Sequence, residues 1–170
     1  NWLEEFTDKY NLKLPFHANM RFEFIDPLKE KGRKRLELLK RAGCDGLSLA
    51  IESGDETIRK EVLNRNTPEE LIFRVMYALK ENNFMVRTYN MLGFPYGATT
   101  IPTKMNLDAD LETLELNVKL KKETGLPTFA WASTLVPYPG TKIAEYCSKY
   151  GFYEGNLEDI SGDETYRINS

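Results

Sequence analysis

The run Gly46–Ile51 constrains the fold most, because it is short, almost wholly apolar, and ends abruptly in Glu52, Ser53 and Gly54. Such a run before a helical pattern is typical of a buried parallel strand, in which both faces are covered. Ligands of parallel sheets gather at the carboxyl ends of the strands. The run therefore predicts that Glu52 and Ser53 lie at the edge of the sheet where ligands bind. The alternative is a strand-stopping turn, in which Ser53 or Asp55 caps the next helix.

Three further strand-like segments alternate with helical patterns along the 170 residues. This alternation predicts an α/β fold, a parallel sheet of strand-helix repeats with right-handed crossovers. The pattern fits both a doubly wound sheet and part of a barrel. The predicted strands are 16–24, 46–51, 85–92 and 129–136, and the predicted helices are 26–41, 55–63, 67–81, 108–124 and 142–150.

The helical segments carry more specific expectations. Thr67 to Glu70 has the sequence of a capping box with proline at the first helical position. Gly32 interrupts the helix predicted over 26–41. The residues spaced as one amphipathic stripe in the helix over 108–124 are Leu107, Leu111, Leu114 and Val118. Trp131 of the last strand is expected to pack in the core or against a helix.

Polar residues alternate with apolar ones in the predicted strand 16–24, which is unusual for a buried strand. One interpretation is an edge strand with one wet face. The other directs Asn19 and Arg21 into a polar cavity, where a guanidinium beside an amide suits a carboxylate. Arg87, Tyr89 and Asn90 likewise share a strand. If the sheet is part of a barrel, one parity of them faces its interior and is a candidate for ligand contacts, although an arginine on a strand can also simply reach solvent.

The bulk properties exclude several classes of protein. With 23 basic and 26 acidic residues, the net charge of -3 provides no field for a polyanion, so we expect no nucleic-acid partner. No apolar stretch approaches the roughly 18 residues of a membrane span. Cys44, Cys147 and the single His17 are too few and too scattered for a zinc or iron-sulfur site, and predict free thiols in a reducing cytoplasm.

Four short sequence motifs, in or just after the predicted strands, together resemble the second half of a radical S-adenosylmethionine (SAM) enzyme core. Each motif alone is weak, but the four occur in the order and register of that core over about residues 15–150. They are most similar to members with a preceding cobalamin-binding domain, a group that includes the anaerobic magnesium-protoporphyrin ester cyclases. The motifs are Ala18–Arg21, Ile51–Gly54 followed by Asn64-Arg65, Asn90–Pro95, and Pro137–Thr141.

The resemblance implies strands three to six of a partial TIM-like (β/α) barrel in residues 1–150, followed by a polar tail, 151–170. Such enzymes use a 4Fe-4S cluster to cleave SAM reductively and form a 5'-deoxyadenosyl radical, which acts on a small-molecule substrate. The family's CxxxCxxC cluster motif has no counterpart here. We therefore expect a fragment, inactive alone, whose parent carries that motif upstream of Asn1. An uncovered edge at strand 16–24 would invite self-association.

The resemblance also implies cofactor-binding residues in the first two motifs. Glu52 and Ser53 fall where the family contacts the ribose and methionine parts of SAM. Arg65 falls where several members hold the methionine carboxylate, a group that a guanidinium fork binds well. Asn19 and Arg21 of the earlier motif are further cofactor-binding candidates.

Met91 and Gly93 fall in the motif that packs near adenine, where a glycine permits close approach. Tyr96 stands where an acid often closes this motif. Two other hypotheses follow from the missing cluster cysteines. One is a complete small α/β enzyme with Glu52 as general base and Arg21 or Arg65 holding an anionic substrate. The other is a non-catalytic α/β interaction domain.

Overall fold

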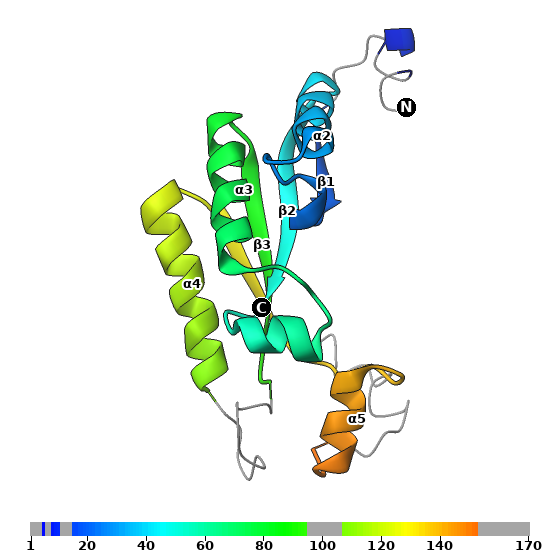
Figure 1. Cartoon of the computed structure of the whole chain (residues 1–170), viewed down its shortest axis with the longest axis vertical. Helices are drawn as coiled ribbons and strands as arrows, with labels where there is room; N and C mark the ends of the chain where they lie inside the picture. Colours follow the sequence, from blue (N-terminus) through cyan, green and yellow to red (C-terminus); the bar gives the residue numbers. More distant parts are fainter. Residues whose placement is uncertain (1–4, 6–7, 11–14, 95–106, 153–170) are drawn as a thin grey trace.

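Four parallel strands form one sheet, in the order in which they occur along the chain (Figure 1). The structure is a computed structural model that describes residues 5, 8–10, 15–94 and 107–152. Because a helical segment follows each strand, all crossovers return the chain in the same direction, as the alternating pattern predicted. The strands are β1 Phe16–Met20, β2 Cys44–Glu52, β3 Met85–Leu92 and β4 Phe129–Thr134.

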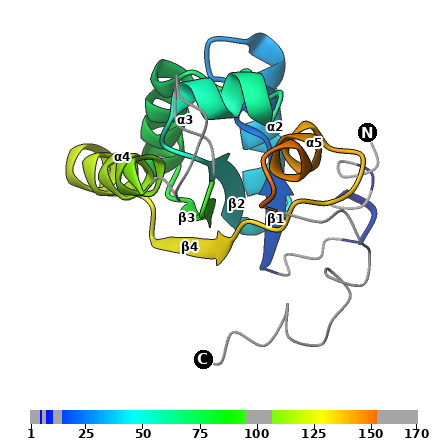
Figure 2. The same ribbon diagram turned by 90° about the horizontal axis from the view of Figure 1, so that it is seen from below.

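Helices α2, α3 and α4 lie along one face of this sheet, and α5 lies near the end where the strands finish (Figures 1 and 2). A short 3₁₀ segment, η1, follows β1, and a π-helix, η2, follows β2. No described helix is long and apolar enough to cross a membrane. The bounds are η1 Phe22–Phe24, α2 Glu30–Arg41, η2 Ile58–Val62, α3 Glu69–Glu81, α4 Asp108–Thr124 and α5 Lys142–Lys149.

The core lies between the sheet and α2, α3 and α4. Leu47, Leu49 and Ile51 of β2 point into it, and all three are almost fully buried. The intervening residues of β2 and β3 point to the opposite side, which we call the open face. The open face is defined by Ser48, Ala50, Arg87 and Tyr89.

The predicted strand 16–24 is too long. Strand β1 ends at Met20, the last residue in register with β2. The chain then forms η1, because Phe22 turns into the core, where 1% of it is exposed. The prediction of strand 85–92 is confirmed, whereas the last strand ends at residue 134 instead of 136.

The helix predicted from Asp26 begins only at Glu30. The carboxylate of Asp26 accepts the backbone N–H of Leu28 at 3.2 Å, which makes a turn there. Gly32 lies inside α2 and does not interrupt it. It is a glycine because a Cβ at this position would overlap the backbone of Asp26.

The capping box predicted at the start of α3 does not form. Pro68 is the N-cap residue and no side chain caps the helix. The hydroxyl of Thr67 is instead 3.2 Å from the carboxylate of Glu23, to which it donates. A tertiary contact has replaced the local one.

The expected stripe of α4 is not its buried face. Leu107, Leu111, Leu114 and Val118 are all exposed, and the opposite side of the helix contacts the sheet. Trp131 is not a core residue either, since 50% of it is exposed and every residue of β4 is exposed. Strand β4 is a sheet edge without helix cover among the described residues. The buried side of α4 is Ala109, Thr113, Leu116, Asn117, Leu120 and Thr124.

Candidate functional site

The end of β2 has an irregular backbone that sets the direction of Glu52. Along β3, Tyr89 pairs with Ala50 and the next residue, Asn90, pairs with Glu52, so β2 carries one extra residue. Glu52 has a φ of 72°, in the left-handed region that a glutamate rarely adopts. Such a conformation costs about 1–3 kcal/mol and is concentrated at functional sites. A bulge of this kind re-aims a side chain at the end of a strand.

Glu52 forms an ion pair with Arg65, from the segment between η2 and α3. The carboxylate Oε1 lies 2.8 Å from Nη2 of the guanidinium. The Glu52 side chain is 13% exposed and that of Arg65 is 32% exposed, so solvent reaches the arginine more easily. Burial raises the pKa of Glu52 above its ordinary value of 4.5, and the charge of Arg65 offsets part of that rise.

An open cavity of about 540 Å³ lies beside this pair, on the open face. Small-molecule sites have volumes of about 300–1,000 Å³, so the cavity has a suitable size. Its walls come from the end of β1, the open face of β2 and β3, and the segment before α3. The lining residues are Asn19, Met20, Arg21, Phe24, Ser48, Ala50, Leu63, Asn64, Arg65 and Tyr89.

The cavity brings together four of the predicted site residues. Asn19, Arg21 and Arg65 line it, and Glu52 is joined to it through Arg65. Both interpretations of the polar first strand hold, because β1 is a sheet edge and its exit also lines a cavity. Arg21 forms a 3.3 Å ion pair with Glu23.

The other three predicted residues lie elsewhere. Ser53 is fully buried, and its hydroxyl oxygen accepts the N–H of Asp55 at 3.2 Å. Met91 packs in a separate apolar cluster. Gly93 donates its N–H to Asp110 at 2.9 Å and has a φ of 83°, which explains the glycine. A contact of these residues with SAM stays a prediction, and Tyr96 lies outside the described residues.

The turn after Ser53 shows the capping chemistry of the alternative interpretation. One carboxylate oxygen of Asp55 accepts the N–H of Thr57 at 2.7 Å and that of Ile58 at 3.2 Å. These contacts satisfy donors at the helix start that would otherwise lack partners. The functional interpretation and the turn interpretation therefore each hold, but for different residues of this segment. Glu52 lies at the cavity, whereas Ser53 and Asp55 build the turn.

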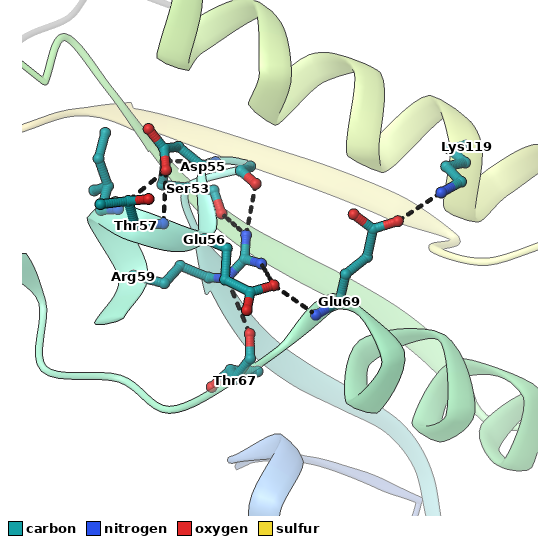
Figure 3. Close-up of polar contacts among 10 residues, drawn as sticks. Ser53, Asp55, Glu56, Thr57, Arg59, Thr67, Glu69 and Lys119 are labelled. Carbon is teal, nitrogen blue, oxygen red and sulfur yellow. Dashed lines mark hydrogen bonds and ion pairs between the residues drawn. The ribbon is translucent and has the colours of Figure 1, made fainter. Parts of the chain in front are cut away.

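Arg59 holds the site together, and sequence reasoning missed it. Its guanidinium is 1% exposed and lies under the turn (Figure 3). It donates to the carbonyls of Ser53 at 2.6 Å, Gly54 at 2.7 Å and Thr67 at 3.0 Å. Its own carbonyl accepts the N–H of Arg65 at 2.7 Å. Arg59 thus links the residues after Glu52 to the segment that carries Arg65.

The inward direction of Arg59 follows from the π-helix. Leu63 donates to the carbonyl of Ile58, five residues earlier, so η2 is wider than an α-helix. π-Turns of this kind often occur at functional sites. An arginine beside apolar Ile58 is normally assigned to solvent, and the sequence gives no signal that would reverse this.

The structure shows which of the polar residues of β3 share a side of the sheet. Arg87 and Tyr89 belong to the open face, where Tyr89 lines the cavity. Asn90 points to the helices: it donates to the carbonyl of Trp131 at 2.9 Å and accepts from Asn117 at 3.0 Å. Asn90 is therefore a structural residue, and only Arg87 and Tyr89 lie on the side of the sheet that carries the cavity.

The residues of this chain do not fit an iron-sulfur cluster. A cluster needs several thiolates, and the chain has two cysteines, far apart. Burial raises the pKa of both thiols, which keeps Cys44 and Cys147 protonated. Cys44 donates to the carbonyl of Gly46 at 3.2 Å. Within the described part of the chain, no group of three or more His, Cys, Asp or Glu could hold a metal ion.

Comparison with known proteins identifies the class. The sequence profile of the radical SAM superfamily matches residues 7–97, which is more than half of the chain, and the chain belongs to this superfamily. This membership favours the SAM interpretation over the two alternatives. No curated protein matches the chain.

A solved structure has the same fold. It is the radical S-adenosylmethionine methyltransferase TsrM from Kitasatospora setae, with cobalamin and a 4Fe-4S cluster bound. The TM-score is 0.55 and the sequence identity 18% over 86% of this chain. This chain spans 27% of the length of TsrM. The similarity confirms the α/β fold as part of a radical SAM barrel.

The raised pKa of Glu52 predicts a pH dependence of stability. The folded state holds this proton more tightly than the unfolded state, so the free energy of unfolding falls as pH rises from about 4.5 through the folded pKa. Glu52→Gln removes the titration. We expect the variant to gain stability relative to the wild type as pH rises from 4 to 7, measured by urea unfolding. A constant difference between the two proteins would contradict the assignment.

Proposed function

We propose that this chain is the second half of the catalytic domain of a radical SAM enzyme, and that it binds the amino-acid part of SAM. The observation that carries the proposal is the Glu52–Arg65 pair beside the cavity. The family membership indicates SAM as the cofactor, and the pair has one charge opposite to each charge of the amino-acid part of SAM. The domain would occupy residues 1–150, with 151–170 as a polar tail.

The pair suits the methionine end of SAM, which carries an α-ammonium and an α-carboxylate. Arg65 would bind the carboxylate through its guanidinium fork, while Glu52 would accept hydrogen bonds from the ammonium. Each charge then meets an opposite one, and neither is left unpaired in a partly buried place. Asn19 and Arg21, on the cavity wall, are in position to contact the rest of the cofactor.

With a 4Fe-4S cluster held by other residues of the parent enzyme, SAM would supply a 5'-deoxyadenosyl radical. This chain has only two cysteines, too few for that cluster, so we expect it to be inactive alone. Within the site, Glu52 and Arg65 would orient the methionine part of SAM. A cobalamin-binding domain in the parent protein is consistent with the TsrM similarity. We place the parent enzyme in a reducing cytoplasm, acting on a small molecule.

The proposal is tested by comparing two nucleosides that differ in the amino-acid part. S-adenosylhomocysteine contains it and 5'-methylthioadenosine does not. We expect calorimetry on the chain to show at least about tenfold tighter binding of S-adenosylhomocysteine, because charge-assisted contacts of this kind contribute about 1.5 kcal/mol or more. Arg65→Ala and Glu52→Ala are each expected to abolish this advantage and to leave the affinity for 5'-methylthioadenosine unchanged.

Lys34→Ala is the matched control. Lys34 forms a 2.6 Å ion pair with Glu30 on α2, and both side chains are largely exposed. This variant should bind both nucleosides like the wild type. Equal affinities for the two nucleosides in the wild type, or an unchanged preference in both site variants, would refute the proposal.

A further inference from the structure

An exposed aromatic surface lies on the open face, where β3 pairs with β4. It consists of Arg87, Tyr89, Phe129 and Trp131, which we call the aromatic wall. In the β3–β4 register, Arg87 pairs with Phe129, and Tyr89 with Trp131. Paired residues of neighbouring strands project from the same side of a sheet. All four side chains therefore belong to the face that carries the cavity.

The side chains of the aromatic wall are arranged against one another. The rings of Phe129 and Trp131 have centroids 6.2 Å apart and are inclined by 47°. The guanidinium of Arg87 lies 5.7 Å from the centroid of Phe129. Hydrogen bonding from Arg87, and then from Ser48, lowers the pKa of Tyr89. The wall is thus continuous with the cavity, since Ser48 and Tyr89 both line it.

The aromatic wall is exposed to solvent in the described part of the chain. About half of Phe129 and of Trp131 is exposed, at 51% and 50%. Across the described residues, no carboxylate pairs with Arg87, whereas Arg21 pairs with Glu23 and Arg65 with Glu52. Arg87 is therefore a cation on the open face with no acidic partner in the described part of the chain. Its neighbours are flat apolar rings.

We infer that the aromatic wall binds the substrate, and that this substrate is a planar aromatic molecule carrying an anionic group. Trp131 would stack with its aromatic part, Phe129, whose ring is inclined to that of Trp131, would contact its edge, and Arg87 would bind its carboxylate or similar group. SAM fits the Glu52–Arg65 pair better than the wall, because the pair has a partner for both its carboxylate and its ammonium, whereas no described carboxylate lies beside Arg87 to meet the ammonium. The inference rests on the proposed function, since it assigns the wall to the substrate of that enzyme.

The test uses three probes on the whole chain in calorimetry: naphthalene-2-carboxylate, the neutral naphthalene-2-carboxamide, and the non-aromatic cyclohexanecarboxylate. We expect the first to bind at least about tenfold more tightly than either of the others. Arg87→Gln should equalise the carboxylate and the carboxamide. Trp131→Leu should weaken both naphthalene probes and leave cyclohexanecarboxylate unchanged.

Two controls match these variants. Tyr77→Leu removes a half-exposed aromatic from α3, and Arg33→Gln removes an exposed arginine from α2. Neither should change the affinity for any probe. Circular dichroism of all four variants separates lost binding from lost folding, and a folded Arg87→Gln variant that keeps the carboxylate preference would overturn the inference.

The outcomes also separate this inference from the proposed function. S-adenosylhomocysteine should bind Arg87→Gln as it binds the wild type. If Arg87→Gln weakens S-adenosylhomocysteine and the naphthalene probes equally, the wall belongs to the cofactor site and the inference fails. Equal binding of all three probes, or none, also overturns it while leaving the nucleoside test intact. So does a concentration-dependent dimer that Trp131→Leu dissociates, because a second copy would then cover the wall.

Discussion

Arg59→Leu is expected to lower the free energy of unfolding by about 3–5 kcal/mol, because each buried acceptor left without a donor costs about 1–3 kcal/mol. The substitution leaves the carbonyls of Ser53, Gly54 and Thr67 without their donor in a buried place. The residues after Glu52 and the segment that carries Arg65 would then separate. Urea unfolding measures the loss.

Arg59→Lys and Arg35→Leu complete this experiment. A lysine keeps the charge but not the planar fork, so it cannot reach all three carbonyls, and we expect an intermediate loss. Arg35 donates to the carbonyl of Phe24 at 2.8 Å from an exposed position, so its loss should cost about 1 kcal/mol or less. A similar cost for Arg59→Leu and Arg35→Leu would contradict the assigned role.

A readout of binding distinguishes positioning from stability alone. Below the melting temperature of Arg59→Lys, we expect weaker S-adenosylhomocysteine binding and unchanged 5'-methylthioadenosine binding. This selective loss follows because only the amino-acid part would contact Glu52 and Arg65. Unchanged binding of both nucleosides by the folded variant would limit Arg59 to a structural role.

Gly54→Ala is the second substitution with a large expected effect. A Cβ on Gly54 would overlap the backbone of Glu112 and Thr113 in α4, which cannot move like a side chain. The N–H of Gly54 also donates to the hydroxyl of Thr113 at 2.7 Å. The alanine must push α4 away from the end of β2. We expect a loss of about 3 kcal/mol in urea unfolding, at the upper end for overpacking.

Gly46→Ala is the matched control, inside the strand that Gly54 follows. There the atoms nearest to the added Cβ belong to the imidazole of His17, a side chain that is 48% exposed and can rotate away. We expect its cost to be clearly smaller than that of Gly54→Ala. If the two variants lose equal stability, the close approach of α4 is not what requires a glycine after Ser53.

Much of the fold could be predicted from the sequence, because short apolar runs alternate with helical patterns. The bounds of β3 were predicted to the residue, since turn residues flank its apolar run. The motif resemblance also brought forward Glu52 and Arg65, which the structure pairs. Their charges and their places after β2 and η2 are properties of the sequence. The distance between them is not.

The tertiary structure decided which polar residues are buried. Arg59 turns inward through a π-helix to meet three carbonyls. The apolar stripe of α4 faces outward, because the opposite side of the helix contains Thr113 and Asn117, whose hydrogen bonds to Gly54, Thr88 and Asn90 compensate for burial. Periodicity identifies apolar residues, but it cannot show a polar residue whose partner lies on another element. For this reason the sequence determined the sheet and the candidate pair, and only the structure placed them around a cavity.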